Sequence, residues 1–302
     1  MADVTILLST YNGEKYLEEQ LESIVSQRDI SPRLVIRDDG SKDGTLKMIR
    51  AYAEKYPFIS YYTGENLGAT GSFFDLIKNA GKSDYYAFSD QDDVWDEDKL
   101  IAAVSMLEAH ESEPAMYYSN LRITDENLNF IRLSHTAPHV LKNRNSAVIR
   151  NMATGCTVVY NRALQKLVMD KDPSGYSGHD EWLFAVASYF GKTVYDFEPH
   201  ISYRLHGTNE VGTYGKKSIS GMLRRFSELL ELPEDERLKN TEILLDNFGE
   251  LLTDEDRRAL ETVSDYKKSP ASACRLLLSD SLRTGSAARN LAAFIRILER
   301  KF

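Results

Sequence analysis

The chain has 302 residues, of which 42% are hydrophobic, and a formal net charge of -9 at pH 7. This length and apolar content suffice for one large domain, or for one domain with a small appendage. The acidic balance argues against general nucleic-acid binding, because that function needs a basic face.

Short apolar runs alternate with helical patterns from the first residue to about position 120. This alternation is typical of βαβ units around a mainly parallel sheet. It predicts strands at 4–9, 34–37, 59–63 and 84–89. The predicted helices span 14–27, 43–55, 71–80 and 97–109.

Each predicted strand runs into a polar loop, at 10–13, 38–41, 65–68 and 90–93. Ligands of open parallel sheets bind beyond the carboxyl ends of the strands, so these loops are expected to line one cleft. A second portion, from 115 to about 207, contains strand-like pieces at 115–119, 156–160 and 193–196 and a helix near 180–189. Beyond 216 the chain is expected to be helical.

The fourth predicted strand ends in Asp90-Gln91-Asp92-Asp93. Residues two apart in an extended chain point the same way, so Asp90 and Asp92 are expected to converge on one hard divalent cation. Such a cation is commonly shared with substrate phosphates, which suggests metal-assisted phosphate chemistry. The alternative is an acidic turn that caps the next helix. Asp93 is assigned that capping role and is left out of the site.

Several familiar motifs are absent from the sequence. No Gly-x-Gly-x-x-Gly follows the first strand, and both Gly-Lys-Ser/Thr triplets lack the upstream glycine of a P-loop. Neither His-Glu-x-x-His nor Gly-x-Ser-x-Gly occurs. Dehydrogenase, P-loop, zinc protease and serine hydrolase functions therefore lack local support.

The loop after the second strand carries Asp38 and Asp39. An ionised carboxylate only accepts hydrogen bonds, so Asp39 can accept the N3–H of uracil or thymine but cannot pair with N3 of cytosine. This chemistry favours a UDP or dTDP donor over a CMP donor. The following Ser41, Asp43 and Gly44 are interpreted as turn and capping residues.

Three segments taken together resemble glycosyltransferase family 2: Leu8 to Gly13, Asp38 to Thr45 and Ser89 to Trp95. The resemblance covers about the first 210 residues and is greatest to bacterial rhamnosyltransferases of cell-wall and O-antigen polysaccharide synthesis. It implies a GT-A type α/β fold, with a Rossmann-like, mainly parallel sheet flanked by helices, over 1–215 and a C-terminal helical region over 216–302. It also implies an inverting enzyme that needs Mg²⁺ or Mn²⁺ and a donor such as dTDP-L-rhamnose.

The resemblance implies roles for individual residues. Asp92 matches the metal-binding member of the family's Asp-x-Asp, and Asp39 the residue that reads the pyrimidine. Asp90 would face the ribose and the metal. The donor-binding residues implied are Thr10, Tyr11, Asn12, Asp39, Asp90 and Gln91.

An inverting transfer needs a base that takes the proton of the acceptor hydroxyl. The resemblance assigns it to Asp180 in Gly178-His179-Asp180-Glu181-Trp182. Adjacent helical residues point about 100° apart, so only one of Asp180 and Glu181 serves, and the choice stays open. The alternative is that both merely favour the positive end of a helix.

The segment Tyr203 to Asn209 resembles the family element that folds over the diphosphate. If it is extended, Arg204 and His206 reach the same side, where His206 would complete the metal shell and Arg204 would contact phosphate or acceptor. The alternative is a solvated strand end. The predicted acceptor residues are Trp95, Thr154 and Trp182, with core packing as the alternative for both tryptophans.

The segment 267–302 holds eight basic and two acidic residues, so the remainder of the chain carries about -15. Its last part reads as a basic amphipathic helix suited to an anionic membrane surface, or to packing on the catalytic domain or a second subunit. The leucines of 220–262 predict a helical hairpin that could form a homodimer. No apolar stretch approaches the ~20 residues of a membrane span. The two cysteines, Cys156 and Cys274, form no disulfide or zinc pattern, which predicts a cytoplasmic protein, peripheral at the inner face of the membrane.

The leading hypothesis is therefore transfer of L-rhamnose to a saccharide or lipid-linked saccharide acceptor. A family 2 transferase that uses a UDP-sugar is the first alternative. A nucleotidyltransferase that makes nucleotide sugars would need a Gly-rich, basic first loop, which Thr10 to Gly13 does not provide. A non-catalytic sugar-binding module would not need both Asp92 and Asp180, and replacing either with Asn would leave its binding intact.

Overall fold

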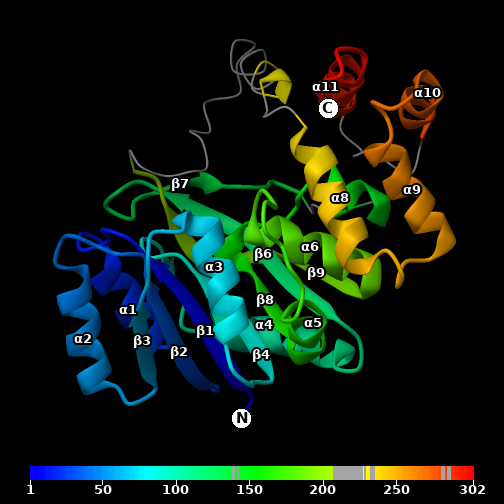
Figure 1. Ribbon diagram of the computed structural model, residues 1–302. Helices are drawn as coiled ribbons and strands as arrows, with labels where there is room; N and C mark the ends of the chain where they lie inside the picture. Colours follow the sequence, from blue (N-terminus) through cyan, green and yellow to red (C-terminus); the bar gives the residue numbers. More distant parts are fainter. Residues whose placement is uncertain are drawn as a thin grey trace. The chain divides into compact units, whose positions relative to one another are not determined.

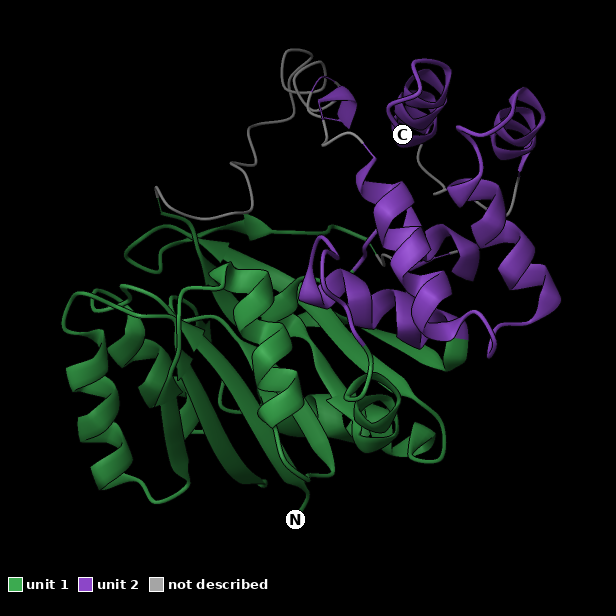
Figure 2. Cartoon of the chain, viewed as in Figure 1, with its two compact units in different colours: residues 1–139, 153–171, 190–209 green, residues 140–152, 172–189, 210–302 purple. Residues whose placement is uncertain are grey.

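The computed structural model describes residues 1–137, 140–141, 143–206, 227, 229–231, 235–279, 283 and 287–302. The chain divides into two compact units (Figure 2). Unit 1 comprises residues 1–139, 153–171 and 190–209, and unit 2 comprises residues 140–152, 172–189 and 210–302. The predicted boundary between 215 and 216 lies outside the described residues.

Unit 1 is built on one mixed sheet whose strands follow the order β3-β2-β1-β4-β8-β6-β9-β5, with β7 paired to β6. The first four strands along the chain are parallel, as the sequence predicts, with bounds β1 Asp3–Thr10, β2 Ser31–Asp38, β3 Ile59–Thr63 and β4 Tyr85–Ser89. The remaining strands are β5 Val94–Trp95, β6 Ala115–Thr124, β7 Phe130–Leu133, β8 Val159–Asn161 and β9 Lys192–Arg204. The short strands β5 and β7 were not predicted.

Helices cover both faces of this sheet (Figure 1). Their bounds are α1 Leu17–Val25, α2 Thr45–Lys55, α3 Gly68–Asn79, α4 Lys99–Leu107 and α5 Arg162–Val168. Successive strand residues face opposite sides, so Leu8 packs in one core with α1 and α4, whereas Phe88 meets Phe73 of α3 at 5.2 Å between ring centroids. Burial on both faces explains why β1 and β4 read as continuous apolar runs.

The strand register brings the predicted loops together. Thr10 of β1 is opposite Asp38 of β2, Asp38 is opposite Thr63 of β3, and Leu8 is opposite Ser89 of β4. Because these strands are parallel, the loops that follow them leave the same edge of the sheet. The strand β9, 13 residues long, pairs parallel with β6 and antiparallel with β5, and its last residue is Arg204. The sequence predicts only residues 193–196 of it.

Unit 2 is helical. Its helices are α6 His179–Phe190, whose last residue lies in unit 1, α8 Glu236–Phe248, α9 Asp254–Ser264, α10 Pro270–Leu278 and α11 Ala287–Leu298. Thr253 caps α9 and Ser269 caps α10, each accepting a backbone N–H three residues on. Within the described part of the chain, no helix combines the length and apolarity needed to cross a bilayer. The predicted hairpin at 220–262 falls partly outside the described residues.

One ion-pair cluster on β9 makes the stability of unit 1 dependent on pH. His200 Nδ1 lies 3.1 Å from Asp98 Oδ1, and its Nε2 lies 3.3 Å from Asp196 Oδ2. The hydrogen bond to Asp196, helped by that to Asp98, raises the pKa of His200 against the opposing effect of burial. The protonated form is therefore stabilised by folding. The contribution of this protonated ring to the free energy of unfolding is complete below the ordinary histidine pKa. It is lost as pH rises through the raised pKa of His200 in the folded protein.

We predict that the contribution of His200 to the free energy of unfolding falls as pH rises from the ordinary histidine pKa through the raised pKa, and that His200→Gln removes this part of the pH dependence. The substitution should cost about 1 kcal/mol at the lower pH and less at the higher. Urea unfolding of both proteins at several pH values measures it. His110→Gln is the matched control, because His110 pairs with the partly exposed Glu113 and should change little. An unchanged pH profile in His200→Gln would contradict the assignment.

Candidate functional site

The loops after β1 and β2 are tied to each other. Thr10 Oγ1 donates to Asp38 Oδ1 at 3.1 Å. Asn12, at a φ of 48° that asparagine tolerates better than most residues, donates its N–H to Ser41 and accepts from the backbone of Lys42 at 2.8 Å. Thr10 and Asn12, both predicted to bind the donor, thus also hold the two loops in register.

Gln91 connects the loop after β4 to the loop after β1. Its Oε1 accepts from the Tyr11 N–H at 2.9 Å, and its Nε2 donates to the Tyr11 carbonyl at 3.1 Å. The amide passes so close to Gly13 that a Cβ there would clash with it, which explains the glycine. The Tyr11 side chain is 47% exposed. Gln91 therefore orients Tyr11 through its backbone and leaves the ring accessible.

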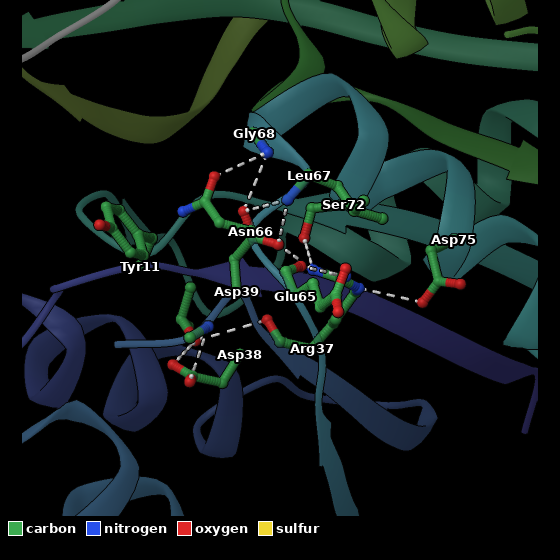
Figure 3. A network of polar contacts seen from close by, with 12 residues as sticks. Tyr11, Arg37, Asp38, Asp39, Glu65, Asn66, Leu67, Gly68, Ser72 and Asp75 are labelled. Carbon is green, nitrogen blue, oxygen red and sulfur yellow. Dashed lines mark hydrogen bonds and ion pairs between the residues drawn. The ribbon is translucent and has the colours of Figure 1, made fainter. Parts of the chain in front are cut away.

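Asp39 is buried in a polar network at the start of α3 (Figure 3). Its Oδ1 accepts from Arg37, and its two oxygens accept from the backbone N–H groups of Leu67 and Gly68 at 2.9 to 3.1 Å. Arg37 also donates to Ser72 and to Asp75. These donors fix the orientation of the Asp39 carboxylate, whose oxygens accept hydrogen bonds as reading a pyrimidine N3–H requires. Contact with a base stays a prediction.

Asp92 and His206, both predicted to bind the metal, come together. His206 Nε2 lies 2.6 Å from Asp92 Oδ2, although the residues are 114 positions apart. Their side chains are 12% and 19% exposed. The ring of Tyr16 packs against His206 with centroids 4.9 Å apart and restricts its orientation.

Asp90 and Asp92 do not share an extended segment. Residues 91–92 form a bend, so the alternation of side chains that the sequence argument used does not apply. Asp90 groups instead with Asp93 and Cys156, whose ligand atoms all lie within 4.8 Å of one another. Asp92 is the member of the acidic loop that meets His206.

The capping role predicted for Asp93 is wrong. The residue that precedes α4 is Asp98, whereas Asp93 is fully buried and accepts the Arg204 N–H at 3.2 Å. Burial raises the pKa of the Asp93 carboxyl well above its ordinary value, and Asp92 and Asp90 raise it further. Asp93 anchors the end of β9 to the acidic loop.

Arg204 links several parts of unit 1 beneath this loop. It is 2% exposed, and its guanidinium donates to the Asp92 carbonyl at 3.0 Å and to the Glu126 carbonyl at 2.6 Å. It also pairs with Glu19 of α1 and lies 4.6 Å from the centroid of the Tyr16 ring. Arg204 thus acts on Asp92 through its main-chain carbonyl and on His206 through the Tyr16 ring, which contacts both residues. The predicted contact with phosphate or acceptor stays untested.

We predict that Arg204→Met destabilises the protein by about 2 to 3 kcal/mol, because it removes buried hydrogen bonds and leaves Glu19 without its partner. Half-saturation by Mn²⁺ should also move to higher concentration. Chemical unfolding and metal titration measure the two effects. Arg28→Met is the matched control, since Arg28 pairs with Glu97 at the surface and should cost less than about 1 kcal/mol. Normal stability of Arg204→Met would contradict the linking role.

The predicted base lies in unit 2 at the start of α6. Asn151 Nδ2 donates to Asp180 Oδ2 at 3.0 Å, and the Glu181 N–H donates to Asp180 Oδ1 at 2.9 Å. Glu181 accepts from the hydroxyl of Ser177. Burial is the chief cause that raises the pKa of Glu181. The two carboxylates therefore differ in orientation and environment. Burial also lowers the pKa of the neighbouring His179 to about 3, so this ring is neutral at physiological pH.

Both tryptophans pack in the interior. Trp95 is 3% exposed and lies 3.7 Å below Lys99 Nζ, and Trp182 is 1% exposed between Tyr176 and Phe248. A sugar cannot stack on an indole face that is covered in this way, so the structure favours the core alternative for both. Thr154, partly exposed, holds a short turn by accepting from Thr157 through its carbonyl.

Sequence reasoning missed the residues that orient the site. Tyr16 and Glu19 belong to no motif, and their partners are distant in sequence. Among the orienting residues, Arg37 could have been found from the sequence. An arginine inside an apolar strand, next to two aspartates, needs a buried partner.

The donor set suits a divalent cation. One carboxylate and one imidazole nitrogen lie in contact, and a set of oxygen and nitrogen ligands fits Mn²⁺ or Mg²⁺ completed by phosphate oxygens and water. When bound, such an ion neutralises charge that builds on a departing diphosphate.

The parallel strands β1 to β4 with an acidic loop after β4 define a GT-A glycosyltransferase fold. The sequence pattern of Glycosyl transferase family 2 matches residues 5–168, and the chain belongs to this family. It is 31% identical to the dTDP-rhamnosyl transferase RfbG of Shigella flexneri, over 68% of this chain and 73% of that protein. It is also 23% identical to an uncharacterized glycosyltransferase of Rickettsia typhi, over 70% of this chain and 66% of that protein.

Solved structures show the same fold. S. aureus TarS 1–349 in complex with UDP-GlcNAc has a TM-score of 0.56 at 18% identity, covering 98% of this chain and 90% of that one. The mannosyltransferase PcManGT of Pyrobaculum calidifontis, in complex with GDP-Man and Mn²⁺, has a TM-score of 0.52 at 15% identity, covering 99% and 88%.

Proposed function

We propose that this protein is an inverting, metal-dependent glycosyltransferase that moves L-rhamnose from dTDP-L-rhamnose onto a saccharide or lipid-linked saccharide in surface polysaccharide synthesis. The observation that carries metal dependence is the contact between Asp92 and His206 at the edge of the sheet. The similarity to a dTDP-rhamnosyl transferase supports the donor. The fixed carboxylate of Asp39 supports a thymine or uracil base.

Each residue has a defined task in this proposal. Asp92 and His206 would hold Mn²⁺ or Mg²⁺, and Asp39, Thr10 and Tyr11 would position the nucleoside. Asp180 would accept the proton as the acceptor oxygen attacks the anomeric carbon. The bond from that carbon to the diphosphate breaks, and its electron pair leaves with the nucleoside diphosphate. Attack opposite the leaving group inverts a β-L donor to an α-L linkage.

Peripheral contact with the inner face of the cell membrane, through the basic C-terminal helix, belongs to the proposal because a lipid-linked acceptor resides there. A cytoplasmic location suits a nucleotide-sugar donor and two free cysteines. A homodimer formed by the helical region is a separate proposal, which the mass of the protein in solution would test.

Release of nucleoside diphosphate from several donors tests the proposal. The panel contains dTDP-rhamnose, UDP-glucose, UDP-galactose and UDP-N-acetylglucosamine, each with Mn²⁺ or with chelator. We expect slow, metal-dependent hydrolysis of dTDP-rhamnose alone. Turnover of a UDP-sugar would leave the family assignment unchanged and would show that the donor is not dTDP-rhamnose. Absence of turnover and of binding with every donor would overturn the proposal for these donors.

A further inference from the structure

The last two helices of unit 2 expose an unusual amount of apolar surface. Leu278 of α10 is 77% exposed. On α11, Leu291, Phe294 and Leu298 are 53%, 46% and 62% exposed. The latter three follow one another at intervals of three and four residues, so they lie along one face of the helix. An apolar stripe of this kind on a soluble fold marks a contact surface.

A cavity opens beside this stripe, and all the residues that line it belong to unit 2. Its volume is about 270 Å³, and most of its lining is apolar, including Leu276, Leu277, Leu291, Phe294, Ile297 and Phe302. It contains none of the predicted site residues. Its volume is slightly below the usual range for small-molecule sites, about 300 to 1,000 Å³, and a hydrocarbon chain suits its lining better than a nucleotide sugar does.

Exposed basic residues lie on the same two helices and at their ends. Along α10, α11 and their ends, the described exposed charged residues are Arg275, Arg283, Arg289, Glu299, Arg300 and Lys301. Five of the six are basic in a chain whose net charge is -9. The sixth basic residue of this region, Arg296, is buried and donates to the carbonyls of Leu230 and Lys301. It therefore closes the end of α11 instead of facing solvent.

This charge distribution decides between occupants of the face. In a two-fold dimer the same surface meets itself, so basic residues would oppose basic residues across the contact. A nucleic acid would suit the charge but would leave the apolar stripe in water. An anionic lipid surface satisfies both, because headgroup phosphates meet the arginines while hydrocarbon receives the apolar side chains.

We propose that the α10–α11 face of unit 2, defined by Leu278, Leu291, Phe294, Leu298 and the cavity beside them, docks on an anionic lipid surface. The apolar side chains enter the boundary between headgroups and acyl chains, and one chain end occupies the cavity. The acidic remainder of the protein is repelled by the same surface, so docking fixes which side of unit 2 meets the lipid. The proposal deepens the membrane contact of the proposed function.

Flotation of the full chain with vesicles tests the proposal. We expect binding to vesicles of phosphatidylcholine with phosphatidylglycerol, a sharp loss of binding at high salt, and little binding to phosphatidylcholine alone. Phe294→Glu should weaken binding by about tenfold or more, because it removes an inserted ring and adds a repelled charge. Leu278→Glu should also weaken vesicle binding. Because the Leu278 side chain is exposed, the substitution should not disturb folding, so weaker binding would reflect the lost surface contact.

Leu251→Glu is the matched control, since Leu251 is 59% exposed in unit 2 outside this face and should leave binding unchanged. Equal binding to both vesicle types, no binding to either, or equal loss in the control would overturn the proposal. A dimer in solution that Phe294→Glu dissociates would assign the face to a second copy instead. The assay uses neither donor nor acceptor, so its failure is distinct from failure of the proposed transferase activity, which donor hydrolysis measures separately.

Discussion

Replacing Asp92 with asparagine should lower metal-dependent donor turnover by about 100-fold to 1,000-fold. Asparagine keeps the shape of the side chain but removes the negative charge, so His206 loses its ionic neighbour and a divalent cation loses a strong ligand. The main-chain carbonyl of Asp92, which accepts from Arg204, is unchanged, and the fold should persist. Nucleoside diphosphate release with Mn²⁺ or chelator measures the effect.

Direct Mn²⁺ binding, followed by calorimetry in the presence of the nucleoside diphosphate, separates metal loss from other defects. Asp265→Asn is the control, because Asp265 forms only an exposed pair with Lys268 on unit 2. Wild-type turnover in Asp92→Asn would exclude this carboxylate as a metal ligand. Equal turnover of the wild type with chelator would exclude metal dependence itself.

Asp180→Asn should reduce glycosyl transfer by about 100-fold to 10,000-fold, because it removes the group proposed to take the acceptor proton. Asn151 already orients this side chain through one oxygen. Glu181→Gln should cost less than about tenfold, since the Glu181 carboxylate is directed to Ser177 and is partly desolvated. Initial rates of transfer to the acceptor, with donor in excess, compare the two variants.

The comparison also decides between Asp180 and Glu181, a choice that the sequence leaves open. A larger loss in Glu181→Gln would move the base to Glu181. Small losses in both would place the base elsewhere. Donor binding should be normal in each variant, because neither carboxylate belongs to the predicted donor site. A parallel loss of donor binding would indicate a folding defect instead.

The periodic part of the fold was predictable and the long-range part was not. Strands β1 and β4 were predicted because burial on both faces makes each an apolar run with polar residues after it. The two-residue strand β5 carries no pattern of its own, since it exists only by pairing with Ile201 and Ser202. Most of β9 was missed because its residues are half-buried and mixed in polarity.

The candidate site also has a part that the sequence predicts and a part that depends on tertiary contacts. Asp92 and His206 were predicted to act together, and the structure brings them into contact. The bend at 91–92 could not be anticipated from spacing, so the grouping of Asp90 with Asp93 and Cys156 was not predicted. The burial of Arg204 depends on Glu19 and Glu126, which are distant in sequence and unremarkable alone. Motifs predict which residues take part, and tertiary contacts determine what each one touches.

The late position of β9 in the chain has a consequence for synthesis on the ribosome. A nascent chain that has emerged only as far as α6 contains β6 and β5 but not the strand that pairs with both. Its sheet then ends in an open edge, to which another extended segment can add. The contact between Asp92 and His206 also waits until residue 206 has emerged. During synthesis, closing the open sheet edge and bringing together the proposed metal ligands are therefore one event.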